Sequence, residues 1–366
     1  MPEKKTRTIK LRHLEVTNFK ALDKLIIEFP PPRMSNDPDI FIMGSKNGLG
    51  KTSVLESCAL LFLAATVGEE LLDIRHSPDM PINLPELLIR AGAKEANIEG
   101  IFDINDKEFK VSLELMKNGE IKIKGKIESF SKWRILHRIS PGELVQTFLF
   151  SLVGLNSEPM INPPFLYFHS YRKVQEGNPE LGMMVERERM LTRRSRYHIG
   201  YDFPISGFKL QILRSMMGEA NLFEGVGDKH AGEVLTKLNQ LVEFFAGGRI
   251  KKLRPSQDNT IDFRIYPTKN EREEKSFTFD GLSSGQKEII STLFLIWYHS
   301  LNIPAIVLID EPELHLNVEW HRDFVKRAFD LAPQNQYIIA THSEDIFSSV
   351  SQDRRALLDV PKKVSI

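Results

Sequence analysis

The sequence predicts an α/β fold with a mostly parallel core sheet, an added antiparallel β-sheet and a helical lobe. Residues 40–43 and 305–309 are continuous apolar runs, which is typical of parallel strands covered on both faces. Residues 96–129 instead alternate apolar and polar side chains, as the strands of an antiparallel sheet do. Residues 176–255 contain apolar side chains at helical spacing among many Glu and Arg, which indicates the helical lobe.

The N-terminal segment, residues 1–66, is expected to contain a strand pair, a glycine-containing loop and a first helix. The pair is predicted at residues 10–16 and 25–29, separated by a polar turn and ended by consecutive prolines. Residues 54–67 are the most apolar stretch of the chain, but Glu56 interrupts them and they are too short to span a bilayer. We therefore expect a buried helix there and no association with a membrane.

The C-terminal segment, residues 258–345, returns to the core sheet. A helix is predicted from Gly285 to about Ser300, and four short strands are expected at residues 260–266, 276–279, 305–309 and 337–340. No heptad repeat accompanies the helical lobe, which excludes a long coiled-coil arm. These parts are expected to form one composite domain over residues 1–366.

Composition excludes several classes of protein. Hydrophobic residues at 41% and charged residues at 27% are ordinary for a folded protein, which argues against disorder. Lys plus Arg equals Asp plus Glu at 49 each, so no overall charge draws the chain to nucleic acid or anionic lipid. The single cysteine, Cys58, excludes an internal disulfide. With no export signal visible, we expect a cytoplasmic location.

A phosphate-binding loop follows the strand predicted at residues 40–43. Small residues let consecutive backbone N–H groups converge on phosphates, and the helix that follows presents its N-terminus to them. Lys51 can reach the β and γ phosphates of ATP, and the Thr52 hydroxyl can ligate Mg²⁺. The first glycine of the usual pattern is replaced by Ser45, with Gly44 one position earlier. The predicted loop consists of Ser45, Lys46, Asn47, Gly48, Leu49, Gly50, Lys51 and Thr52.

Two further motifs support a nucleotide site. The apolar strand at residues 305–309 ends in Asp310, suited to hold Mg²⁺, and in Glu311, suited to polarise an attacking water. A polar segment opening the helix near residue 285 can bind an anion, although alone it could also be an ordinary helix cap. That segment contains Ser283, Ser284, Gly285 and Gln286.

Residues 282–286 resemble the L-S-G-G-Q signature of ABC-type ATPases, and residues 340–343 resemble that family's switch-histidine loop. The resemblance implies that ATP lies between two copies of the chain. Ser284 and Gly285 of one copy would cap the γ-phosphate held by Lys51 of the other, and His342 would contact the same phosphate. A homodimer or higher oligomer would then depend on ATP.

The opening at residues 14–21 and the stretch at residues 310–316 are similar to the RecF-like, SMC-like and OLD-like group of P-loop ATPases, of the AAA_15/AAA_21 type. In this group a His-Pro pair often follows the acidic strand, where this sequence has Asn317–Val318. A glutamine that senses Mg²⁺ usually follows the strand near residues 165–169. Gln175 is the nearest candidate, with Arg172 close by, although a solvated loop explains Gln175 equally well.

Stand-alone ATPases of this group resemble subunits of bacterial anti-phage systems, including Septu-type, retron-associated and PARIS-type modules. We therefore expect ATP hydrolysis that regulates a separately encoded effector, a nuclease or toxin, because too few residues follow His342 for a nuclease domain. The alternatives are a nucleotide-gated sensor or scaffold with little turnover, and a RecF-like DNA-repair ATPase. DNA or RNA could bind a basic cluster, although such runs are usually solvated faces. The cluster contains Arg193, Arg194 and Arg196.

Overall fold

The computed structural model describes residues 8–34, 37–44, 50–68, 87–136, 140–152, 158–179, 206–219, 231–256, 260–269 and 275–358. Its contacts divide the chain into two compact units. The first combines the residues up to Arg172 with those from His299 onward, and the second is Lys173–Tyr298. In the sequence, the second unit is thus an insertion between the two parts of the first, and each unit is described by itself. The single composite domain over residues 1–366 stays a prediction.

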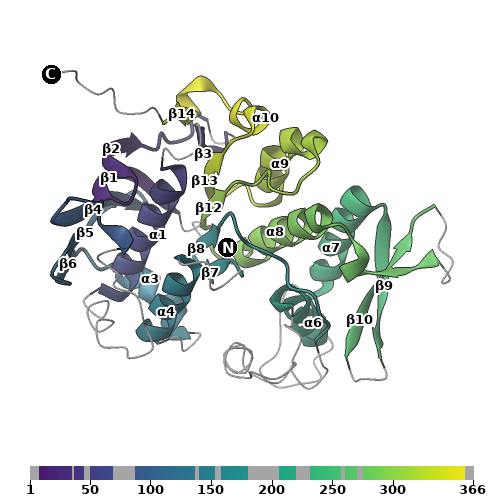
Figure 1. The fold of residues 1–366 in the computed structure, drawn as a ribbon. Helices are drawn as coiled ribbons and strands as arrows, with labels where there is room; N and C mark the ends of the chain where they lie inside the picture. The colour runs from purple at the N-terminus through teal and green to yellow at the C-terminus, as the bar shows by residue number, and fades with distance from the viewer. Residues whose placement is uncertain are drawn as a thin grey trace, which may run out of the picture. The chain divides into compact units, whose positions relative to one another are not determined.

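A six-stranded sheet forms the centre of the first unit (Figure 1), in the order β14-β3-β13-β12-β8-β7. Neighbouring strands are parallel except β7 and β8, which are antiparallel. The four inner strands are buried along their whole length, in agreement with their continuous apolar runs. The strands are β3 (Asp39–Gly44), β7 (Met160–Asn162), β8 (Phe165–Phe168), β12 (Ile306–Asp310), β13 (Gln336–Thr341) and β14 (Arg355–Leu357).

A five-stranded antiparallel sheet also belongs to the first unit, in the order β2-β1-β4-β5-β6. The predicted meander is present, and its turns at Asn105–Asp106 and at Gly119 have the positive φ angles typical of tight hairpins. The N-terminal pair was expected to be separate from this meander, but β1 pairs with β4 and joins it. The strands are β1 (Ile9–Phe19), β2 (Leu22–Glu28), β4 (Glu95–Ile104), β5 (Glu108–Met116) and β6 (Ile121–Lys124).

Helix α1 (Lys51–Val67) contacts strands of both sheets and is buried on all sides, as its apolar sequence predicted. Phe62 stacks on Phe165 of the core sheet and on Phe130 of α3 (Glu128–Leu136). The charge of Glu56 is balanced within α1's surroundings by Lys20, whose Nζ lies 2.7 Å from both carboxylate oxygens. Three more helices complete the unit: α4 (Pro141–Leu152), α9 (Val318–Leu331) and the short α10 (Glu344–Phe347).

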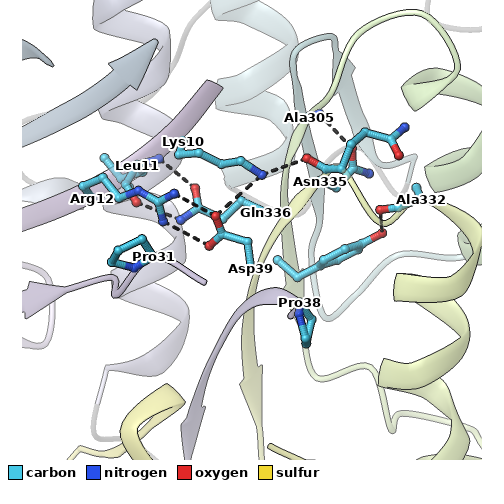
Figure 2. Close-up of polar contacts among 12 residues, drawn as sticks. Lys10, Leu11, Arg12, Pro31, Pro38, Asp39, Ala305, Ala332, Asn335 and Gln336 are labelled. Atoms are coloured by element: carbon cyan, nitrogen blue, oxygen red, sulfur yellow. Dashed lines mark hydrogen bonds and ion pairs between the residues drawn. The ribbon is translucent and has the colours of Figure 1, made fainter. Parts of the chain in front are cut away.

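Polar side chains join the two sheets at the amino ends of the parallel strands (Figure 2). The register of β1 against β4 shifts between Leu11 and His13. The Gln336 side chain accepts from Leu11 N at 2.7 Å and donates to Leu11 O at 2.8 Å, as a neighbouring strand would. Beside it, Arg12 donates two hydrogen bonds to the buried carboxylate of Asp39. This seam fixes the antiparallel sheet to the end of the core sheet that lies away from the phosphate loop.

Within its described residues, the second unit contains helices α6 and α7, a three-stranded antiparallel sheet and most of α8. The Asn239 side chain bonds both the amide and the carbonyl of Ile250, which ties the edge strand β9 to α7. The predicted helical lobe was extended too far, because residues 248–255 form β9 instead. The elements are α6 (Gly207–Glu219), α7 (Ala231–Ala246), β9 (Gly248–Pro255), β10 (Ile261–Pro267), β11 (Phe277–Thr278) and α8 (Ser284–Ser300).

Candidate active site

The phosphate loop lies between β3 and α1, at the carboxyl edge of the core sheet where α/β proteins bind ligands. Gly50 precedes α1 with φ of 90°, and a Cβ there would approach Leu22 Cδ2 to 2.7 Å, so the position requires glycine. A Cβ at Gly44 would approach Phe347 to 2.7 Å, which explains the glycine one position early. The predicted loop residues Ser45, Asn47, Gly48 and Leu49 lie outside the described residues.

Thr52 and Asp310 meet at this edge, one from the first turn of α1 and one from the end of β12. The Thr52 hydroxyl donates to Asp310 Oδ2 at 2.8 Å. Asp310 is fully buried, and among the described residues its other carboxylate oxygen, Oδ1, has no hydrogen-bond partner. Burial raises the pKa of Asp310 to about 7, while the Thr52 hydrogen bond opposes this shift. A buried carboxylate oxygen without a donor, beside a hydroxyl, is the donor set that a hard divalent cation prefers.

Glu311 follows Asp310 in a left-handed backbone conformation, with φ of 47°. Its amide donates to Ala340 O on β13 at 2.8 Å. Its carboxylate is half-buried, and Oε1 lies 3.4 Å from Nε2 of His342. An acidic group and an imidazole therefore face each other at the mouth of the site.

Lys51 Nζ lies 2.8 Å from Nε2 of the same histidine. Burial lowers the pKa of Lys51, and the charges of Glu311, Asp310 and Glu313 oppose this effect. An ammonium can only donate, so this contact uses Nε2 as an acceptor, whereas Glu311 can only accept from Nε2 when the nitrogen carries a proton. His342 Nε2 thus faces two neighbours with opposite requirements.

Glu313 connects the loops that follow β12 and β13, and the sequence did not single it out. Its carboxylate accepts from the Thr341 hydroxyl at 2.7 Å, from Ser343 N at 3.2 Å and from His342 N. Charge-assisted bonds of this kind are stronger than neutral ones. The carboxylate therefore fixes the backbone that carries His342.

Arg172 is a second residue that the sequence mentioned only in passing. The side chain is buried, and its guanidinium donates to the main-chain carbonyls of His169, Asp310 and Glu311. A hydrogen bond to a main-chain carbonyl can form whatever side chain the accepting residue carries. The sequence around His169, Asp310 and Glu311 therefore could not reveal these contacts. The arginine joins the carboxyl ends of β8 and β12.

The signature segment lies in the second unit, at the start of α8. Ser283 N donates to Gln286 Oε1 at 3.0 Å, and Gln286 N donates to Ser283 Oγ at 3.3 Å. This reciprocal pair is a capping box, so the helix-cap interpretation of the motif holds for these two side chains. Ser283 and Ser284 are both exposed, whereas Gly285 is buried. Because the Ser283 hydroxyl belongs to the capping box, Ser284 is the exposed serine of this motif that lies outside the cap.

The remaining predicted positions are not tested by this geometry. Gln175 belongs to the second unit, in the segment that follows Arg172, and its assignment to Mg²⁺ stays a prediction. Arg193, Arg194 and Arg196 lie outside the described residues. None of the helices in the described parts of the chain combines the length and the apolar character needed to cross a bilayer.

Known structures share the fold of this chain. The structure of an SmcHead bound to the C-winged helix domain of ScpA matches 93% of the chain and 92% of its own length, with a TM-score of 0.54. The identity is 13%, so the match concerns the fold alone. It supports the predicted SMC-like α/β architecture with a mostly parallel sheet and an added antiparallel one.

Two curated relatives have sequence similarity. The retron Vc95 probable ATPase of Vibrio cholerae is 21% identical over 96% of this chain and 74% of its own length. The DNA replication and repair protein RecF of Agathobacter rectalis is 30% identical over 109 residues, which is 30% of this chain and only a quarter of RecF.

The family described as "AAA domain, putative AbiEii toxin, Type IV TA system" matches residues 46–348. This range runs from the phosphate loop to beyond His342 and includes both acidic residues at the end of β12. The chain therefore belongs to this family of P-loop ATPases.

Proposed function

We propose that the chain binds ATP with Mg²⁺ at the carboxyl edge of its core sheet and hydrolyses the γ-phosphate bond. The observation that carries this proposal is the Thr52–Asp310 hydrogen bond. It joins the end of the phosphate loop to the acidic strand, although 258 positions separate the two residues in the sequence. In P-loop NTPases these two residue types hold the cation that bridges the β and γ phosphates.

The donor set fits Mg²⁺. In the part of the chain that the structure describes, Asp310 has a buried oxygen without a hydrogen-bond partner, and the Thr52 oxygen is its neighbour. When bound, Mg²⁺ would neutralise part of the phosphate charge and orient the leaving group. Thr52 would hold it directly, and Asp310 would hold it directly or through its water shell.

The remaining residues of the site divide the chemistry among them. Lys51 supplies a positive charge to the β and γ phosphates, which carry the negative charge of the transition state. Glu311 accepts the hydrogen bond of the attacking water and its proton as the P–O bond forms. His342, held by Glu313 through its backbone, donates to the γ-phosphate once that phosphate engages Lys51.

A complete site requires a second copy of the chain. By the resemblance to ABC-type signatures, Ser284 and Gly285 of one subunit would lie against the γ-phosphate bound by the other. The exposure of Ser284 at the first turn of α8 supports this arrangement, because a helix N-terminus attracts phosphate. Dimerisation would then require ATP.

We further propose that the nucleotide-driven dimer regulates a separately encoded effector in a bacterial defence system. Similarity to a retron ATPase over 96% of the chain and membership of a family named for a toxin support this setting. Two other functions differ in measurable ways. A sensor or scaffold would bind ATP with little turnover, and a RecF-like repair ATPase would bind DNA with a strong dependence on salt.

Phosphate release by the wild type and by Glu311→Gln tests the enzymatic proposal. Loss of the catalytic base should lower turnover by at least about 100-fold, while ATP affinity changes little. Equal rates for the two proteins would reject Glu311 as the base. A wild-type rate no higher than that of Lys51→Ala would favour the sensor.

A further inference from the structure

Arg172 connects two strand ends of the site through main-chain atoms. Its Nη1 donates to His169 O at 2.9 Å and to Asp310 O at 2.7 Å, and Nη2 lies 3.3 Å from Glu311 O. The side chain is only 7% exposed. Strands β8 and β12 are parallel neighbours, so the guanidinium spans the gap that opens where both leave the sheet.

The Glu311 backbone is held from two sides. Its φ of 47° is uncommon for a residue with a Cβ, and such conformations persist when the surroundings impose them. Ala340 on β13 accepts from its amide, and Arg172 donates to its carbonyl. Without the guanidinium, the Glu311 carbonyl and the buried Asp310 carbonyl would both lose the hydrogen bond from Arg172.

We infer that Arg172 is a positioning residue for ATP hydrolysis. It fixes the backbone of Asp310 and Glu311, so that the Glu311 carboxylate faces the water that attacks the γ-phosphate. The inference rests on the proposed role of Glu311 as the base. The proposed effect of Arg172 on turnover passes through Glu311 and requires no contact of Arg172 with the nucleotide or the attacking water.

Arg354 offers a matched control for a purely structural arginine. It is 5% exposed and donates to Pro38 O at 2.6 Å and to Pro31 O at 3.2 Å. Pro31 and Pro38 lie beside the polar seam between the sheets, before β3 begins (Figure 2). Arg354 thus has the same chemistry as Arg172 at the opposite end of the parallel strands.

The test compares Arg172→Ala and Arg354→Ala, each with Glu311 intact and with Glu311→Gln. Phosphate release, Mg-ATP affinity and unfolding midpoint are measured for every protein. With Glu311 intact, Arg172→Ala should lower turnover about 100-fold, as a misplaced catalytic group does, and ATP affinity by less than about threefold. Arg354→Ala should stay within about threefold of the wild type in both.

The double variant isolates the path through Glu311. Because Glu311→Gln already lacks the base, adding Arg172→Ala should lower its residual single-turnover rate no further. Guanidinium chloride at a low, non-denaturing concentration should restore part of the turnover of Arg172→Ala and none of that of the double variant.

Three results would overturn the inference about Arg172. The first is a loss of turnover in Arg172→Ala no larger than that in Arg354→Ala. The second is a loss of ATP affinity in Arg172→Ala as large as its loss of turnover. The third is a lower single-turnover rate when Arg172→Ala is added to Glu311→Gln. Wild-type turnover by Glu311→Gln would instead reject the proposed function, so the two failures are distinct. If Arg172→Ala does not fold, Arg172→Lys and Arg354→Lys are compared by the same criteria, because lysine keeps the charge but reaches fewer carbonyls.

Discussion

Lys51 Nζ lies 2.8 Å from His342 Nε2, so the first residue of α1 contacts the loop that follows β13. This contact uses Nε2 as an acceptor. When phosphates engage Lys51, Nε2 becomes available to donate to a phosphate oxygen or to Glu311, which is 3.4 Å away. We predict that ATP moves the ring proton of His342 to Nε2. The measurement is the ¹⁵N chemical shifts of the His342 ring, and shifts that stay unchanged at saturating Mg-ATP would contradict this prediction. Lys51→Ala is the control, because it lacks the ammonium group that phosphates would draw away from Nε2.

Asp310→Asn should weaken Mg²⁺ binding at the site and lower turnover. The amide can still accept from Thr52, but it offers the cation a neutral oxygen in place of a carboxylate. Turnover should fall by about 10- to 100-fold, as is typical when a metal loses an orienting carboxylate. Titration of activity with Mg²⁺ checks this, with Asp323→Asn on the exposed face of α9 as the control. Unchanged Mg²⁺ dependence would show that the cation binds elsewhere.

Glu313→Ala should loosen the backbone that carries His342. Three donors lose a charged acceptor, and a single bond to a charged group contributes about 1.5–3 kcal/mol. Because the three bonds share one half-buried carboxylate, their contributions do not add, and the free energy of unfolding should fall by about 2–4 kcal/mol. Turnover should fall at least tenfold, because the ring no longer has a fixed position. Denaturant unfolding and phosphate release are the measurements. Glu99→Gln, which breaks a surface pair with Lys110, should change stability by less than about 1 kcal/mol, and an equal effect of both variants would count against the role of Glu313.

His169 should make the first unit less stable in acid. Burial lowers the pKa of His169 from 6.5 to about 4, with the charge of Arg172 adding to the effect. Between these two values the unfolded chain binds a proton that the folded chain does not, so stability falls as pH decreases, by about 1.4 kcal/mol per unit. Asp310, with its raised pKa, contributes the opposite slope from about pH 4 to 7.

The contribution of His169 is therefore measured by comparing how the free energy of unfolding changes with pH in the wild type and in His169→Gln. The free energy of unfolding of His169→Gln should fall less steeply than that of the wild type between pH 6.5 and 4.5. Parallel curves for wild type and His169→Gln would show that this histidine is protonated equally in both states.

Ser284→Arg should block ATP-dependent dimerisation without blocking nucleotide binding. The added side chain would occupy the exposed N-terminus of α8, where the partner's γ-phosphate is expected. Sedimentation with the Glu311→Gln background, which retains ATP, should show a dimer for Thr236→Arg on the exposed face of α7 and a monomer for Ser284→Arg. A dimer of the Ser284 variant at saturating ATP would exclude the signature from the interface.

The chemistry-bearing motifs were visible in the sequence because phosphate loops and acidic strand ends need particular residues at fixed positions. Their meeting at one edge followed from the rule that parallel strands align their carboxyl ends. Which strands pair was harder to predict from the sequence. Alternation in β1 and β2 indicated strands, but it did not indicate that β4 would lie beside β1. The helical lobe was predicted to extend to residue 255, but residues 248–255 form strand β9, which pairs with β10.

Arg172 and Glu313 were missed for a different reason. Arg172 donates to main-chain carbonyls, and two of the three donors to Glu313 are main-chain amides. Main-chain chemistry is the same at every position, so these partners carry no recognisable residue type. Only the folded geometry brings them to Asp310, Glu311 and His342. Side-chain motifs therefore predicted the groups that would face the nucleotide, whereas the residues that hold their backbone required the structure.

Mixing Lys51→Ala with Ser284→Arg tests the central claim, that a complete site combines Lys51 of one copy with Ser284 of another. Each variant alone should be inactive, one through the phosphate loop and the other through the signature. A mixed dimer regains one intact site out of two. Because Ser284→Arg should not pair with itself and Lys51→Ala should lose the ATP on which pairing depends, the dimers that form should be mixed, and an equal mixture should recover up to roughly half of wild-type phosphate release. Activity of the mixture no greater than the average of the two variants measured separately would contradict the composite site.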